Sequence, residues 1–140
     1  MSKDLEKAKE ILQSGNYTCV TVKGNVLHTS SERGVKPLLK WIDEKTELCG
    51  HSAADKVVGK AAAFLYVILG IRQLHACVIS RPALDVLQNH NITVSFDILT
   101  DAIRNRTDTG YCPMEQATKE LNDPQAALTA IIEALKRLNG

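Results

Sequence analysis

The fold prediction starts from Asp55-Lys56-Val57-Val58-Gly59-Lys60-Ala61-Ala62-Ala63, which places a carboxylate and two lysines before an apolar run. Asp at a helix N-cap accepts hydrogen bonds from the first free backbone N–H groups, so the sequence predicts a central helix beginning at Asp55. Lys56 and Lys60 would then share one helix face, where their charges repel and oppose the helix dipole. A bound anion would explain both lysines. Alternatively, both ammonium groups reach water beside a close-packing Gly59.

Helix and strand patterns alternate on both sides of this run. In chain order we expect a helix over 5–12, strands over 17–22 and 25–29, a helix around 35–42, a strand over 48–54, the central helix closed by Gly70, a strand over 74–79, a helix capped at Ser80, and a strand over 92–96. Two strands joined by a helix run parallel. The sequence therefore predicts a three-layer α/β fold. Its mixed sheet has about five strands, with an N-terminal antiparallel hairpin followed by parallel strands.

Local signals mark several of these boundaries. Lys23-Gly24-Asn25 has the composition of a tight hairpin turn. Ser30 and Ser31 are candidate caps for the second helix, which carries Pro37 in its first turn. Arg81-Pro82 follows Ser80 as a helix start with Pro near its first position.

The C-terminal third is expected to contain three further helices, one of them beginning just after Cys112. A short helix is predicted over 98–105, followed by a polar loop over 106–110 that covers a site. Asp123 and Pro124 have the pattern of an N-cap and first helical residue. The apolar stripe of that last helix either packs within the domain or forms a dimer.

Composition favours one domain over residues 1–140, with 1–15 as an added N-terminal helix and 123–139 as the C-terminal helix. The net charge is +1 and no block of Lys or Arg occurs, which argues against a general grip on nucleic-acid phosphates. We do not expect the charged N-terminus to act as a signal peptide, and no apolar run approaches the roughly 20 residues that span a bilayer. We expect a cytoplasmic protein without membrane contact.

The four cysteines and four histidines are widely separated in the sequence. No C-x-x-C pair occurs, so zinc-site spacing is absent. Cys19 and Cys77 lie in apolar, strand-like surroundings and are expected to be small buried hydrophobes. Cys112 differs because it ends a polar loop just before a predicted helix. The histidines have no close partner in the sequence, and we expect structural or surface roles for them.

Three separated motifs carry a resemblance to a known family. They are Gly34-Val35-Lys36-Pro37-Leu38-Leu39, Asp55-Lys56-Val57-Val58-Gly59-Lys60-Ala61-Ala62 and Cys112-Pro113-Met114-Glu115. Together they resemble an uncharacterised prokaryotic family, the domain of unknown function 1893, over roughly residues 17–138. The resemblance implies a cytidine-deaminase-like fold, with an active site at the N-termini of the two central helices.

This chain lacks the residues that zinc deaminases require at those helix starts. Such enzymes need a His or Cys ligand followed by a catalytic Glu at the first start, and Pro-Cys-x-x-Cys at the second. This chain has Asp55-Lys56-Val57 and Ser80-Arg81-Pro82-Ala83 there. We therefore expect a zinc-free protein with no metal ligands and no cofactor.

The resemblance implies that the two helix starts come together and form an anion site. The ligand-binding residues predicted there are Lys56, Gly59, Lys60, Ser80 and Arg81. Cys112 is a candidate nucleophile, with Asp55 or Glu115 moving protons. Alternatives remain for each: Asp55 as an N-cap, Glu115 favouring a helix start, and Cys112 as an inert thiol.

Three functions remain open at this point. The preferred one is a binding protein or zinc-free enzyme that takes a small, anionic, nucleotide-like ligand. The second is a nucleic-acid-modifying or nucleic-acid-binding protein, for which the chain's few aromatic residues leave little material for base stacking. The third is a non-catalytic interaction module whose terminal helix makes the contacts. A homodimer is compatible with the resemblance.

Overall fold

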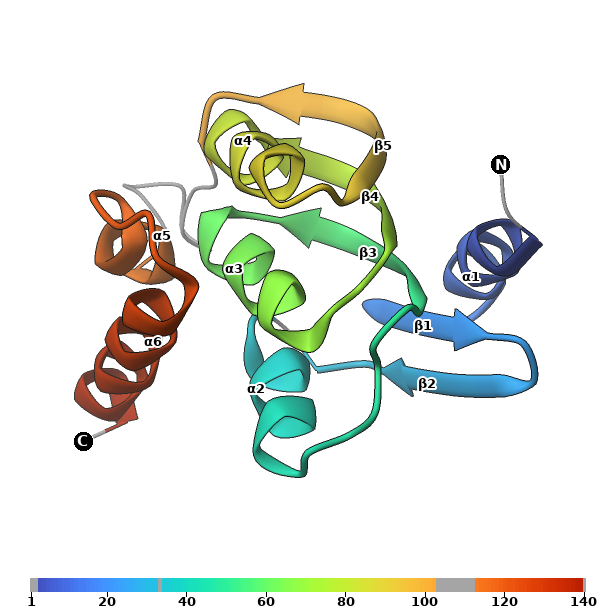
Figure 1. Ribbon diagram of the computed structural model, residues 1–140, viewed down its shortest axis with the longest axis horizontal. Helices are drawn as coiled ribbons and strands as arrows, with labels where there is room; N and C mark the ends of the chain where they lie inside the picture. Colours follow the sequence, from blue (N-terminus) through green and yellow to red (C-terminus); the bar gives the residue numbers. More distant parts are fainter. Residues whose placement is uncertain (1–2, 33, 103–112, 140) are drawn as a thin grey trace.

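A computed structural model describes residues 3–32, 34–102 and 113–139 of the chain. Figure 1 shows α3 and α4 in front of the strands, α5 and α6 together on the left, and α1 apart from the other helices, beside β1. The elements are α1 (Lys3–Ser14), β1 (Cys19–Lys23), β2 (Val26–Ser30), α2 (Lys36–Asp43), β3 (Ser52–Val58), α3 (Lys60–Leu69), β4 (Gln73–Ser80), α4 (Arg81–Asn89), β5 (Thr93–Thr100), α5 (Pro113–Thr118) and α6 (Pro124–Asn139).

The five strands lie in the order β2-β1-β3-β4-β5. β1 pairs antiparallel with both β2 and β3, whereas β3–β4 and β4–β5 are parallel. The α/β class, the N-terminal hairpin and the parallel crossovers predicted from the sequence are thus confirmed.

The larger core lies between the sheet and the layer that contains α2, α3, α4 and α6. α3 is at its centre, and its residues from Ala61 to Tyr66 are all buried. This burial explains why α3 is apolar on every side. Each fully buried large side chain, such as Phe64 or Leu65, contributes about 1.5–3 kcal/mol relative to an exposed one.

A smaller core lies on the opposite face of the sheet. There α1 buries Leu5, Ala8 and Leu12. Two of these residues form one cluster with Val20 of β1 and Ala54 of β3. The first helix predicted from the sequence therefore covers the part of the sheet made by β1 and β3.

The start of the central helix differs from the prediction. Asp55 lies within β3, opposite Ala76 of β4, and α3 begins only at Lys60 with Gly59 as its N-cap. Asp55 is therefore not a helix cap, and Lys56 and Lys60 do not share a helix face. The local preference of Asp for a cap is weaker than the pairing of β3 with strands on both sides.

Two further boundaries also differ. Ser30 ends β2, and α2 has Val35 at its N-cap without any side-chain hydrogen bond, so neither predicted serine caps this helix. β5 continues to Thr100, which makes the helix predicted over 98–105 wrong for its first three residues. The rest of that segment, the loop over 106–110 and Cys112 lie almost wholly outside the described residues.

Other boundaries agree with the sequence signals. Gly70 ends α3 in the left-handed conformation, with φ of 77°. Ser80 caps α4, and Asp123 accepts a hydrogen bond from the backbone of Ala126 at the start of α6. Within the ranges described above, no helix combines the length and apolar character needed to cross a bilayer.

Candidate functional site

The N-termini of α3 and α4 lie at the same edge of the sheet. β3 and β4 are parallel neighbours, and each leads into its helix within two residues. In such sheets, ligands bind beyond the carboxyl ends of the strands. A cleft of about 160 Å³ opens there, lined by Lys60, Ser80, Pro82, Asp101, Ala102, Glu115, Gln116 and Lys119.

Glu115 occupies the N-terminus of α3. Its Oε1 accepts a hydrogen bond of 2.7 Å from the backbone N–H of Lys60, and its Oε2 accepts one of 3.2 Å from that of Ala61. Burial raises the pKa of Glu115, and these two bonds partly oppose the rise. The helix N-terminus therefore already holds an anion, which is the chain's own carboxylate.

Gly59 makes this approach possible. A Cβ atom at position 59 would lie 2.0 Å from Oε1 of Glu115. Any larger residue would push the carboxylate off the helix N-terminus. The predicted importance of Gly59 for close packing thus has a specific contact behind it.

The side chain of Lys60 connects α3 to the residues just beyond α5. Its Nζ donates a hydrogen bond of 2.8 Å to the backbone carbonyl of Lys119, just beyond α5. The same Nζ lies 5.8 Å from the ring centroid of Phe64, one turn along α3. Lys60 therefore lines the cleft and ties α3 to the segment that carries Glu115.

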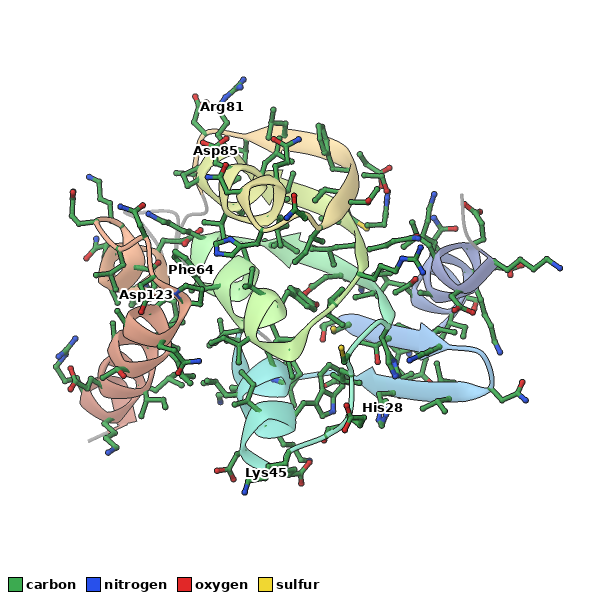
Figure 2. The ribbon with its side chains drawn as sticks, viewed as in Figure 1. His28, Lys45, Phe64, Arg81, Asp85 and Asp123 are labelled. Carbon is green, nitrogen blue, oxygen red and sulfur yellow. The ribbon has the colours of Figure 1, made fainter. Side chains whose placement is uncertain are left out.

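Ser80 and Arg81 form the other side. Ser80 is fully buried, and its Oγ accepts a hydrogen bond of 3.2 Å from the N–H of Ala83. Arg81 lies at the N-terminal end of α4 and points away from α3 (Figure 2). Its Nε lies 2.9 Å from Oδ1 of Asp101, with which it forms an ion pair. That pair is exposed, so it adds at most about 1 kcal/mol to stability.

Asp55 lies apart from this cleft, in the interior between β3 and α3. Tyr66 donates a hydrogen bond of 2.6 Å to Oδ2 of Asp55, and the N–H of Val57 donates one of 3.3 Å to Oδ1. The Sγ of Cys19 lies 3.0 Å from the Tyr66 hydroxyl. Burial raises the pKa of Asp55 to about 7, despite the opposing effect of these bonds.

The structure thus brings together some of the predicted site residues. Gly59, Lys60, Ser80 and Glu115 meet at the cleft, and Arg81 lies beside it. Lys56 is exposed on β3 and does not line the cleft. Sequence reasoning did not identify Asp101, Gln116 and Lys119. The position of Lys119 four residues after Glu115 is the one local signal that would have linked the last of these to the site.

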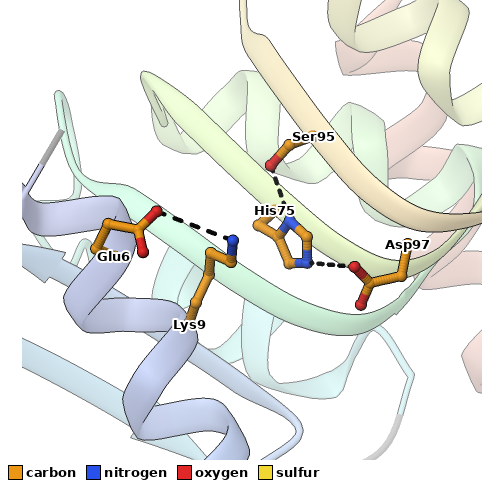
Figure 3. A network of polar contacts seen from close by, with 5 residues as sticks. All are labelled: Glu6, Lys9, His75, Ser95 and Asp97. Carbon is orange, nitrogen blue, oxygen red and sulfur yellow. Dashed lines mark hydrogen bonds and ion pairs between the residues drawn. The ribbon is translucent and has the colours of Figure 1, made fainter. Parts of the chain in front are cut away.

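A second polar network lies on β4 and β5 (Figure 3). His75 contacts Oγ of Ser95 through Nδ1 at 2.8 Å and Oδ1 of Asp97 through Nε2 at 3.5 Å. On α1, Lys9 pairs with Glu6 at 3.9 Å. None of these residues lines the cleft, so this network joins β5 to β4 and is separate from the cleft.

Comparisons with known proteins support one family. The family model described as "TM1506: Domain of unknown function (DUF1893)" matches residues 7–135. The crystal structure of a DUF1893 family protein from Thermotoga maritima is similar, with a TM-score of 0.84 and 25% identity over 98% of this chain and 92% of that one. No curated protein matches the sequence.

A second solved structure is much less similar. It is a diaminohydroxyphosphoribosylaminopyrimidine deaminase/5-amino-6-(5-phosphoribosylamino)uracil reductase from the same organism. The TM-score is 0.42 and the identity 15%, over 67% of this chain and 35% of that one.

Proposed function

Since this chain belongs to the DUF1893 family, whose model covers residues 7–135, we propose that it is a family member without the catalytic zinc of deaminases and that it binds a small anionic, nucleotide-like ligand. The proposed site is the cleft between the N-termini of α3 and α4. One observation carries the proposal: the backbone N–H groups of Lys60 and Ala61 already hold a carboxylate. Helix N-termini suit phosphate for the same physical reason.

The ligand's anionic group would replace Glu115. A phosphate carries more charge than a carboxylate and has more acceptor oxygens, so the same N–H groups and Lys60 attract it more strongly. Displacement also returns a partly buried carboxylate to water, which removes the cost that raises its pKa. Glu115 then acts as a built-in competitor for the site.

The size of the cleft limits what is buried there. About 160 Å³ is less than the roughly 300–1,000 Å³ occupied by drug-sized ligands. We therefore expect the anionic group and a small adjoining moiety to enter the cleft. Gln116, Lys119 and Asp101 lie at its walls and would contact the remainder of the ligand.

The proposal extends to catalysis through Cys112. This residue immediately precedes α5, which places Glu115 in the cleft. We assign the nucleophile to Cys112 and proton transfer to Glu115, which ligand binding releases from the backbone N–H groups of Lys60 and Ala61. Asp55 has no part in this step because it is enclosed by β3 and α3.

We also propose a cytoplasmic location.

The decisive experiment is calorimetric titration with inorganic phosphate and with nucleoside monophosphates. Lys60→Ala should weaken binding about tenfold, the cost of about 1.5 kcal/mol for a charge-assisted contact. The exposed Lys40→Ala variant on α2 is the matched control and should bind normally. Glu115→Gln should have the opposite effect and strengthen binding, because it removes the competing charge.

The outcomes separate binding from catalysis. Equal affinities in the wild type, Lys60→Ala and Glu115→Gln would rule out the proposed anion site. Cys112→Ser should retain ligand binding. If it also retains any turnover found for the wild type, Cys112 is not the nucleophile.

A homodimer is a second candidate role, favoured by an apolar groove between α2 and α6. The groove has a volume of about 590 Å³, and Leu39, Leu128, Ile132, Asp43 and Lys136 are among the residues that line it. Sedimentation of Ile132→Lys tests this surface, since a dimer that persists would not use the groove.

A further inference from the structure

Two buried polar atoms have no hydrogen-bond partner within the described part of the chain. They are Oγ1 of Thr21 and Nδ1 of His51. Thr21 is fully buried and His51 is 3% exposed. A buried polar group without a partner destabilises the fold, so each one calls for a ligand, an ion or a water.

Both atoms belong to one polar cluster on the sheet face beneath α2. Thr21 of β1 is paired with His28 of β2 on one side and Ala53 of β3 on the other. Residues two apart on a strand share a face, which places His51, just before β3, on the face of Ala53. The rings of His28 and His51 lie 5.8 Å apart, tilted by 42°.

Trp41 of α2 covers this cluster. Its ring meets that of His28 edge-on at 6.1 Å between centroids. Figure 2 shows His28 on β2, at the margin of the molecule, and its side chain is half-buried. The cluster therefore has an enclosed end at His51 and Thr21 and a more accessible end at His28.

We propose that His28 and His51 bind a divalent transition-metal ion, with the Thr21 hydroxyl and solvent completing its coordination. Imidazole nitrogens lie about 2.0–2.1 Å from zinc, which places two ligating rings about 5–6 Å apart between centroids. The observed separation of 5.8 Å fits this range. The site is distinct from the α3–α4 cleft and goes beyond the proposed anion binding.

The proposed site supplies two protein nitrogens to the ion, one from each histidine. The described residues contain no metal-compatible group of three or more His, Cys, Asp or Glu side chains. The ion is therefore exchangeable, unlike the closed four-ligand sites of structural zinc. Affinity should rise from Co²⁺ to Ni²⁺ to Cu²⁺ and fall again at Zn²⁺.

The test is calorimetric titration of the chelator-treated full chain with Ni²⁺, Cu²⁺ and Zn²⁺. We expect one ion per chain, and electron paramagnetic resonance of the Cu²⁺ form should show coupling to two nitrogens. His28→Ala and His51→Ala should each weaken binding at least about tenfold, the lower end of the cost of disturbing residues that support a metal ligand. Because His28 is half-buried, its variant is expected to fold.

Two controls make the result specific. His90→Ala should leave metal affinity unchanged, because His90 is exposed and its Nδ1 contacts the Val86 carbonyl at 2.8 Å. Cys49→Ser should also bind normally, although this exposed thiol is two residues from His51. Full affinity in His28→Ala, loss of binding in either control, or no binding by the wild type would overturn the proposal.

Discussion

Tyr66 donates a hydrogen bond of 2.6 Å to Asp55 inside the core between α3 and β3. The same hydroxyl lies 3.0 Å from Sγ of Cys19, so three polar groups share one small volume. Asp55 is 8% exposed and the other two are at most 1% exposed. In an apolar interior, such a network strengthens its own bonds and makes each missing partner costly.

Replacement of Asp55 by Asn should flatten the dependence of stability on pH. The pKa of Asp55 is about 7 in the folded protein, compared with 3.8 for an aspartate that is exposed to water. The stability gained by protonation is therefore fully present below about pH 4 and is lost as pH rises through about 7. Urea unfolding of both proteins across this window should show a loss of a few kcal/mol in the wild type that the variant lacks. Parallel profiles would contradict this role for Asp55.

Tyr66→Phe should destabilise the protein by about 1–3 kcal/mol, because Asp55 loses its side-chain donor in the core. The pKa of Asp55 should also rise further, since the Tyr66 bond lowers it in the wild type. Tyr17→Phe, on the half-buried Tyr17, is the control for loss of a hydroxyl. Equal unfolding free energies for the two variants would show that the buried bond contributes nothing specific.

Gly59→Ala and Glu115→Ala should destabilise the protein through the same contact. Each is expected to cost about 1 kcal/mol, the usual cost of losing an N-cap interaction. The new methyl group displaces only the flexible end of Glu115, so the loss of the cap dominates over the clash. Chemical denaturation measures both effects.

The double variant provides the control for that contact. Once Glu115 has been truncated, the three atoms that lie nearest to a methyl group at position 59 are gone. The combined cost should then be clearly smaller than the sum of the single costs. Strict additivity would mean that Gly59 and Glu115 act independently.

The cysteines should differ in their rates of alkylation in the native state. Cys19 is 1% exposed, and burial raises its thiol pKa, so it should react slowest. Burial also raises the pKa of Cys77, whereas Cys49 is exposed. Cys112, the proposed nucleophile, should react faster than Cys19 and Cys77. Peptide mass spectrometry after brief iodoacetamide treatment gives the four rates, and equal labelling would argue against an activated Cys112.

Boundaries that depend on local chemistry could be predicted from the sequence. Ser80 with Pro82 two residues later marked the start of α4, and Gly70 marked the end of α3. These signals work because the capping hydrogen bond or the left-handed backbone involves only nearby residues.

The start of α3 could not be predicted in the same way. Asp55 resembles a helix cap, but its backbone pairs with Cys19 on β1 and Ala76 on β4. Strand pairing brings together residues from distant parts of the chain, and a local pattern does not contain that information. The same limitation hid the extension of β5 to Thr100.

By itself, the sequence determined the α/β class and the order of the elements from α1 to β5. It also showed Gly59, Lys60, Ser80 and Glu115 as polar or conformationally special residues beside apolar runs. Only the tertiary structure decided which distant groups meet. Glu115 reaches the N–H of Lys60, 55 positions earlier, and His28 comes within 5.8 Å of His51. Periodicity and capping act over a few residues, whereas these contacts exist only after the whole sheet and its helices have packed.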